Sequence, residues 1–342
     1  MNLKIKILAI VMTPLFMACH NIGSTHTSKQ PSGVYMATEG SAQGTTWHIK
    51  YNSFNQEDLT AKFDSILRDF DFSISAYNNK SLLTKINNNE DVVLDNIITK
   101  VFNQSMEIYK LTDGLFDPTC RPLVNAWGFA KHKNVRKPEQ KELDSILQFV
   151  GMDKVRIIDG KIVKDDSRIT LNFNANAQGY SVDIICDWLS ENGYTDYLVE
   201  IGGETRAVGV NPYGQPWRIA IESPIEAATE STREINTIVS VSNKSLCTSG
   251  DYRNFLKTEG KKFSHELDPH TGYPKEDSLL SVSILCNKAI DGDALATAVM
   301  VMGLERGFRF VDSLPNTEAY MIYGKYNGEF GIMKTKGFVI DE

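Results

Sequence analysis

Hydrophobic positions recur along this chain at spacings of three and four in several long segments. Residues 57–71 show this spacing, which is typical of an amphipathic helix with one face on a core. The same period predicts helices over 95–113, ending at Asp113-Gly114, and over 139–149. A further helix is expected from Gly179 to Gly193, where the glycine terminates it. The segment after residue 290 is small and apolar, as in a buried helix.

Other segments alternate with the period of two that a half-buried strand requires. Residues 45–52 alternate in this way, and residues 155–164 predict a hairpin with Asp-Gly at its turn. Further strands are expected at 168–173, 196–203, 205–210, 217–223, 237–243 and 279–285, with a last hairpin over 319–325 and 330–335. Strands and helices come in unequal blocks, so the pattern predicts an α+β fold with a mainly antiparallel sheet and packed helices. Residues 34–342 contain no clear linker, which favours a single intertwined domain.

The first residues do not fit this fold. Lys4 and Lys6 precede an apolar stretch that ends at Phe-Met-Ala-Cys and is too short to span a bilayer permanently. A small residue before Cys19 resembles a bacterial lipoprotein signal. We therefore expect a signal peptide over 1–18, a lipidated Cys19 and a flexible tether over 19–33. This predicts a protein anchored to a bacterial membrane and facing the periplasm. The alternative is a plain secretory signal in which Cys19 is incidental.

The composition narrows the possible partners. The 342 residues are 42% hydrophobic and 23% charged, with a formal net charge of -7 and no basic tract. A nucleic-acid partner is therefore not expected, and a phosphate-binding site would have to use backbone N–H groups or a metal ion. Cys186 and Cys286 lie in apolar runs and are expected to be buried free thiols.

The apolar helix after residue 290 begins with two acidic residues, Asp291 and Asp293. Asp293 and Thr297 are four residues apart, so a helix places them on one face. Carboxylate and hydroxyl oxygens suit Mg²⁺, and the Asn-rich segment 172–179 could add a backbone carbonyl in a loop. These groups fit phosphoryl or nucleotidyl transfer on a pyrophosphate. Asp293 could also serve only the helix dipole, and Thr297 could be a small core residue.

Further polar, glycine-containing segments accompany this helix. They are 43-QGTTW-47, 73-SISAYNNKSLLTKIN-87, 113-DGLFDPTCRPLVNAWGF-129, 200-EIGGE-204, 247-CTSGDYRNF-255 and 264-SHELDPHTGYP-274. Each alone could be a turn or a helix boundary. In this order, and with AQGYSVD and DALATAVMVMG, they resemble the ApbE family of FAD:protein FMN transferases over most of residues 35–335.

The resemblance implies a fold related to the T-fold and an Mg²⁺-dependent enzyme. Such an enzyme transfers FMN from FAD to a Ser or Thr hydroxyl of a target protein through a phosphoester bond and releases AMP. The implied targets are exported or membrane redox proteins, such as subunits of quinone reductases. Two alternatives are an FAD pyrophosphatase that yields FMN and AMP, and a non-catalytic FAD-binding lipoprotein. The chain shows no match to the acceptor pattern of family targets, so self-modification is not expected.

The family's motifs also imply site residues. The metal ligands would be the Asp293 carboxylate, the Thr297 hydroxyl and the Ala175 carbonyl. His265 would help to deprotonate the incoming hydroxyl, with Asp293 or another carboxylate as a second acceptor of the proton. The flavin contacts would be Gln43, Tyr77, Leu115, Phe116, Asp117, Asn172, Gln178 and Leu267.

Three positions depart from the family pattern. Asn172 stands where Asp is usual, Gln178 where Lys or Glu is common, and Asn176 where an apolar residue is usual. A buried Asn176 amide without a partner would cost about 1–3 kcal/mol and would loosen the loop that offers the Ala175 carbonyl.

Overall fold

The computed structural model describes residues 33–129, 136–225, 234–250, 255–258, 261–264, 266–275 and 277–341. The predictions for the signal peptide, for the tether, for the lipidated Cys19 and for the base His265 lie outside the described residues.

An eight-stranded sheet in which every neighbouring pair is antiparallel forms the centre of the molecule. Its order is β1 (Val34–Ala42), β2 (Thr45–Ser53), β5 (Tyr197–Ile201), β6 (Glu204–Val208), β9 (Lys244–Gly250), β12 (Leu279–Cys286), β13 (Glu318–Gly324) and β14 (Phe330–Lys334). Three two-stranded sheets join β3 (Val155–Ile158) to β4 (Lys161–Lys164), β7 (Trp217–Glu222) to β8 (Ile235–Val241) and β10 (Phe255–Thr258) to β11 (Lys261–Ser264). The predicted α+β class with a mainly antiparallel sheet is confirmed.

Five helices lie close to where hydrophobic periodicity predicted them. They are α1 (Thr60–Ile74), α3 (Asn96–Leu111), α5 (Gln140–Leu147), α6 (Asn174–Glu191) and α7 (Ala289–Met302). The sequence pattern missed α2 (Leu82–Asn87), α4 (Arg121–Trp127) and α8 (Leu304–Asp312), and also strands β1, β9, β10 and β11. Among the described residues, no helix is both long and apolar enough to span a membrane.

The strand predicted at 168–173 is wrong, because this segment is irregular. The side chain of Asn87 takes the place of a neighbouring strand there. Its Oδ1 accepts a hydrogen bond from the Leu171 N–H at 2.8 Å, and its Nδ2 donates to the Leu171 carbonyl at 2.8 Å. The N–H of Asn172 donates to the carbonyl of Pro118, also at 2.8 Å. The backbone groups are therefore satisfied without a sheet.

Helix α6 begins at Asn174, so the loop predicted over 172–179 is wrong and Gly179 lies inside the helix. This glycine is needed for packing and not as a helix boundary. A Cβ at position 179 would lie 2.2 Å from the carbonyl oxygen of Ala289 and 2.8 Å from the Cβ of Asp293. The two central helices can therefore touch only because residue 179 has no side chain.

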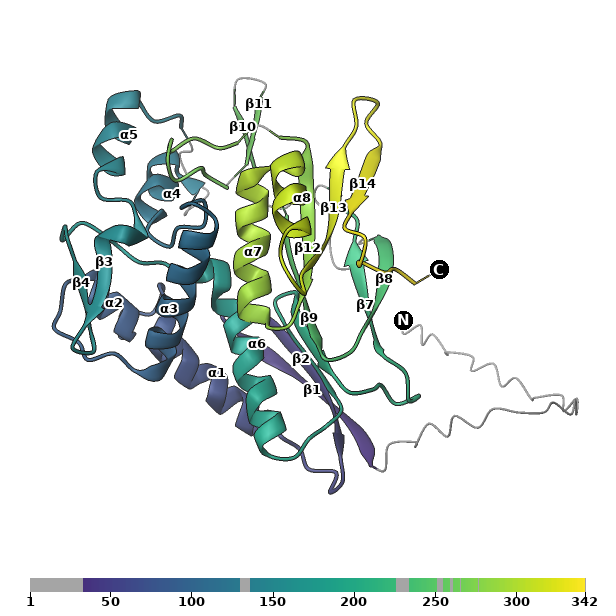
Figure 1. Cartoon of the computed structure of the whole chain (residues 1–342). Helices are drawn as coiled ribbons and strands as arrows, with labels where there is room; N and C mark the ends of the chain where they lie inside the picture. Colours follow the sequence, from purple (N-terminus) through teal and green to yellow (C-terminus); the bar gives the residue numbers. More distant parts are fainter. Residues whose placement is uncertain are drawn as a thin grey trace, which may run out of the picture.

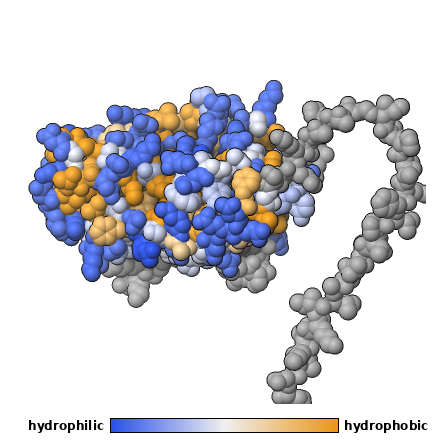
Figure 2. Space-filling view, turned by 90° about the horizontal axis from the view of Figure 1, so that it is seen from below, coloured by the Kyte–Doolittle hydropathy of each residue, from blue (hydrophilic) through white to orange (hydrophobic). Residues whose placement is uncertain are grey.

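The sheet carries helices on one face and a hairpin on the other (Figure 1). Trp47, Val199 and other residues of β2 and β5 pack against α1 and α6. On the opposite face, the β7–β8 hairpin and Phe338 cover Tyr320 and its neighbours. Figure 2 shows that hydrophobic and hydrophilic residues are interspersed on one outer face of the molecule.

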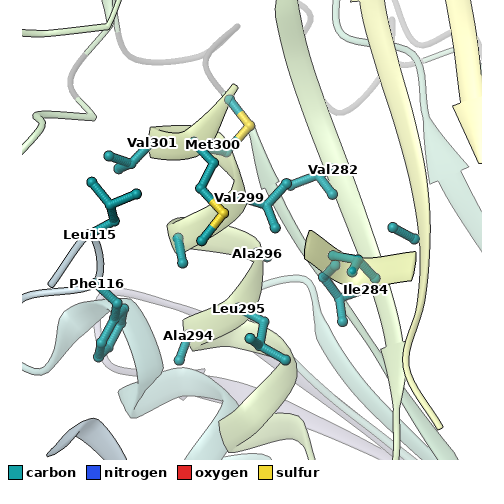
Figure 3. Packing of buried hydrophobic residues seen from close by; sticks show 14 of the residues in the cluster. Leu115, Phe116, Val282, Ile284, Ala294, Leu295, Ala296, Val299, Met300 and Val301 are labelled. Atoms are coloured by element: carbon teal, nitrogen blue, oxygen red, sulfur yellow. The ribbon is translucent and has the colours of Figure 1, made fainter. Parts of the chain in front are cut away.

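Helix α7 is buried between two layers, with most of its residues inaccessible. Leu115 and Phe116 approach it from one side, and Val282 and Ile284 of β12 approach it from the other (Figure 3). A helix enclosed in this way has no polar face, in agreement with its apolar sequence. Any polar group at its start is therefore placed inside the protein.

Candidate active site

The start of α7 is fixed by a side chain of α6. Lys288 precedes the helix and provides no side-chain cap. Instead, Asp183 accepts a hydrogen bond from the Ile290 N–H at 3.0 Å and forms an ion pair with Arg206 at 2.7 Å. A carboxylate at the N-terminus of a helix satisfies its free N–H groups and its dipole. This clamp sets the position of the first turn of α7.

Asp293 lies in this buried turn, with 6% of its surface exposed. Its Oδ2 accepts a hydrogen bond from the Gly179 N–H at 2.9 Å. Burial raises the pKa of the carboxyl to about 7, the Gly179 hydrogen bond lowers it, and the charge of Glu266 raises it. Among the described residues, no Lys or Arg forms an ion pair with Asp293. The site therefore presents a buried carboxylate that a cation would stabilise.

Thr297 follows one turn later on α7, so the structure confirms that the two side chains share a helical face. Thr297 is half-buried, and its Oγ1 lies 3.4 Å from the Oγ of Ser249 on β9. Asp291 has a different neighbour, because its Oδ1 accepts a hydrogen bond from Gln104 of α3 at 2.9 Å. Asp291 therefore ties α7 to α3, as expected for a residue at the start of the helix.

Ala175 lies in the first turn of α6 and is half-buried against the core around α7. In a regular α-helix, the carbonyl of residue 175 accepts from the N–H of residue 179. Here the Gly179 N–H donates to Asp293. Ala175 thus precedes by one helical turn the Gly179 N–H that donates to Asp293.

The amide of Asn176 is partly satisfied. Its Nδ2 donates to the Oε1 of Gln104 at 3.0 Å and to the Oγ of Ser105 at 2.8 Å. Its Oδ1 is buried and has no hydrogen-bond partner among the described residues. Since Gln104 also binds Asp291, a chain of polar side chains joins α6, α3 and α7. The amide anchors the start of α6, although the sequence suggested that it would loosen it.

A pocket of about 490 Å³ lies beside the first turns of α6. It brings together three of the predicted flavin contacts, Gln43, Tyr77 and Gln178. The rest of its lining is Gly44, Phe70, Asp71, Ile74, Ser75, Ala76, Asn174 and Ala177. This mixture of apolar walls and a few polar groups is typical of a site for an aromatic ligand.

Two polar groups of this pocket are available for a ligand. Tyr77 is 78% exposed, its hydroxyl accepts a hydrogen bond from Asn174 at 3.1 Å, and Arg121 lies 5.9 Å from its ring centre. The Nε2 of Gln43 is buried and has no hydrogen-bond partner among the described residues. The sequence did not predict Asp71 and Asn174 as pocket residues, although Asn174 lies in the Asn-rich segment 172–179.

The other predicted flavin contacts lie outside this pocket lining. The side chains of Leu115, Phe116 and Leu267 are buried in hydrophobic clusters. Asp117 accepts hydrogen bonds from the backbone N–H and the hydroxyl of Thr119, at 2.8 and 2.7 Å, and burial raises its pKa to about 6. Asn172 accepts from the N–H of Asn174 at 3.1 Å. Their contacts with flavin stay predictions.

The first two turns of α6 connect the pocket with the carboxylate. Asn174, Ala177 and Gln178 line the pocket, whereas Ala175 and Gly179 are directed at α7. Ala177 and Gln178 follow Asn174 by three and four residues, so these three share one face of the helix. Gly179 follows Ala175 by four residues, so these two share another face. One short helical segment can thus orient a ring in the pocket and a phosphate near Asp293.

Comparisons with known proteins identify the relatives of this chain. The ApbE family model matches residues 43–321. The FAD:protein FMN transferase of Haemophilus influenzae is 31% identical over 336 residues, covering 94% of this chain and 93% of that protein. The corresponding protein of Vibrio cholerae is 33% identical over 282 residues, covering 80% of this chain and 83% of that protein.

Solved structures show the same fold. The structure of the flavin transferase ApbE from Vibrio cholerae superposes with a TM-score of 0.78 at 31% identity, covering 89% of this chain and 98% of that one. The apo form of the Pseudomonas stutzeri flavinyl transferase ApbE gives 0.79 at 30% identity, covering 89% and 96%. The chain belongs to the ApbE family.

Proposed function

We propose that this chain is a flavin transferase that moves FMN from FAD to a target protein. The observation that carries this proposal is the position of α6, between a pocket suited to an aromatic ring and the buried Asp293 carboxylate. The curated relatives named above are FAD:protein FMN transferases, which supports the same activity. The donor of the transferred group is FAD.

The residues at the start of α7 fit a magnesium ion. The set offers only oxygen ligands, and its carboxylate is buried without a described cationic partner. Mg²⁺ prefers such ligands and leaves positions for phosphate oxygens. Asp293, Thr297 and the Ala175 carbonyl would hold it. When bound, the ion would neutralise negative charge on the pyrophosphate.

The chain's own residues would orient the reactants and move one proton. The pocket at Gln43 and Tyr77 would hold a ring of FAD, so that the pyrophosphate lies over α7. The hydroxyl oxygen of a target Ser or Thr forms a bond to the FMN-side phosphorus. The bond from that phosphorus to the bridging oxygen breaks, and AMP leaves. His265 would take the proton of the hydroxyl as a general base.

The cellular setting is part of the proposal. A signal peptide over 1–18 and lipidation of Cys19 would anchor the enzyme to a bacterial membrane, facing the periplasm. Its targets would then be exported or membrane redox proteins with a Ser or Thr acceptor, such as quinone reductase subunits. Both statements rest on the sequence pattern at the N-terminus and on the family resemblance.

A single incubation separates this proposal from its two alternatives. The purified chain is mixed with FAD and Mg²⁺, with and without a target protein, and AMP, free FMN and protein-bound flavin fluorescence are measured. A transferase yields AMP together with a fluorescent target band. AMP and free FMN with an unlabelled target indicate a pyrophosphatase, and FAD binding without AMP indicates a non-catalytic protein. His265→Ala should reduce transfer much more than FAD binding.

A further inference from the structure

Glu204 is a buried carboxyl group that none of the steps above uses. It follows Gly202 and Gly203 at the start of β6, and only 5% of its surface is exposed. Its Oε2 is buried and has no hydrogen-bond partner among the described residues. An unsatisfied buried carboxyl oxygen is costly, so a residue of this kind in a native protein indicates a missing partner.

The turn before Glu204 brings this group close to the active site. Ile201 of β5 pairs with Glu204 of β6, so the two glycines form a tight connection between the strands. Gly202 has a positive φ of 62°, and a Cβ there would lie 2.5 Å from the Nε2 of Gln178. The backbone of this turn therefore lies directly against α6, next to the residues that face Asp293.

The thiol of Cys247 lies between Glu204 and α7. Its Sγ donates a hydrogen bond to the carbonyl oxygen of Ala289 at 3.4 Å. The thiol is also a hydrogen-bond partner of the Glu204 carboxyl and lowers its pKa. A Cβ at Gly292, the residue before Asp293, would lie 2.9 Å from the same sulfur. A thiol has a single proton and cannot donate to both acceptors at once. Cys247 therefore leaves the carboxyl of Glu204 incompletely paired.

The electrostatic environment agrees with this position. Burial raises the pKa of Glu204 well above its ordinary value, and the negative charge of Asp293 raises it further. Hydrogen bonds from Cys247 and from the Thr248 N–H only partly oppose this effect. Among the described residues, no Lys or Arg forms an ion pair with Glu204 or with Asp293.

We propose that Glu204 is a second carboxylate of the metal site and holds the divalent cation together with Asp293. The proposal rests on the metal site proposed above and adds a residue from β6 to the ligands on α6 and α7. A divalent cation would supply the partner that the buried Oε2 lacks, and its charge would compensate two buried carboxylates. In this proposal, the tight turn at Gly202 and Gly203 positions the Glu204 side chain toward the first turn of α7.

The test measures metal binding directly, with Mn²⁺ as the probe. Free Mn²⁺ is counted by electron paramagnetic resonance during titration of the full chain without FAD. Glu204→Gln keeps the size of the side chain and removes its charge, and we expect it to weaken Mn²⁺ binding about 10–100-fold. FAD affinity should change less than about threefold. Glu200→Gln is the matched control, because Glu200 accepts from the Gly203 N–H at 2.7 Å in the same turn but points to the exposed His48.

The possible outcomes separate this inference from the function on which it rests. Loss of Mn²⁺ binding in Glu204→Gln and Asp293→Asn, with normal binding in Glu200→Gln, supports the proposal. Binding within twofold of wild type in Glu204→Gln, together with loss in Asp293→Asn, overturns the role of Glu204 and leaves the metal site intact. Equal binding in all four proteins overturns the metal site itself. If Glu204→Gln does not fold, Glu204→Asp, whose shorter side chain withdraws the carboxylate, is measured against the same outcomes.

Discussion

Gly179→Ala should reverse the usual effect of adding a methyl group to a helix. In an ordinary helix interior this change stabilises by up to about 1 kcal/mol. Here the new Cβ would lie 2.2 Å from the Ala289 carbonyl oxygen and 2.8 Å from the Cβ of Asp293. Since carbon contacts are most favourable at about 3.5–4.0 Å, α6 and α7 would have to separate by on the order of 1 Å. Overpacking of this kind costs about 1–3 kcal/mol.

The same shift should damage the site. It would lengthen the 2.9 Å hydrogen bond from Gly179 to Asp293 and displace the carboxylate from the Ala175 carbonyl. A displacement of about 1 Å near reacting groups can reduce turnover about 100-fold. Urea unfolding gives the free energy, and AMP release from FAD gives the rate. Gly324→Ala is the control, because its Cβ would meet nothing closer than 3.7 Å. Unchanged stability and turnover in Gly179→Ala would refute this account of the helix contact.

Three further predictions concern individual side chains. The folded protein without metal holds Asp293 at a raised pKa of about 7, so it loses stability as the pH rises toward this value and the buried carboxyl ionises. Asp293→Asn should therefore be the more stable protein in EDTA. Its advantage should grow from about pH 4 to about pH 7, level off above pH 7 and disappear with saturating Mg²⁺, as followed by urea unfolding; a pH-independent difference contradicts this. Thr297→Val should weaken Mg²⁺ activation of AMP release at least about 10-fold and leave FAD affinity unchanged, and equal activation would exclude a role for the hydroxyl. Tyr77→Ala should weaken FAD binding by about 1–2 kcal/mol in a fluorescence titration, whereas Tyr77→Phe, which loses only the exposed contact with Asn174, should bind nearly normally.

Periodicity predicted the long helices and most central strands because these elements bury one face against the core. It failed where side chains replace regular pairing. Asn87 satisfies both backbone groups of Leu171, so residues 168–173 have a strand-like sequence without a partner strand. Gly179 is a residue type that often marks a helix boundary, yet it lies inside α6. Its position is explained by its contact with Asp293 of α7, which is more than 100 residues away in the sequence.

The candidate site was predictable only in part for the same reason. The spacing of Asp293 and Thr297 follows from helix geometry, and the structure confirms it. The partners that define the site come from distant segments: Gln104 for Asp291 and Asn176, Ser249 for Thr297, and Cys247 for Glu204. Local sequence carries no signal for such contacts. Asp71 was not predicted because its position on an amphipathic helix is typical of a solvent-exposed acidic residue.

The most direct test of the proposed transfer is the intact mass of a target protein. An exported redox protein with a Ser or Thr acceptor is incubated with FAD, Mg²⁺ and either the wild-type chain or Asp293→Asn. The account predicts that the wild-type chain adds one FMN group to the target and releases one AMP for each group added, and that Asp293→Asn adds none. An unchanged target mass in the presence of rapidly formed AMP and free FMN would contradict it.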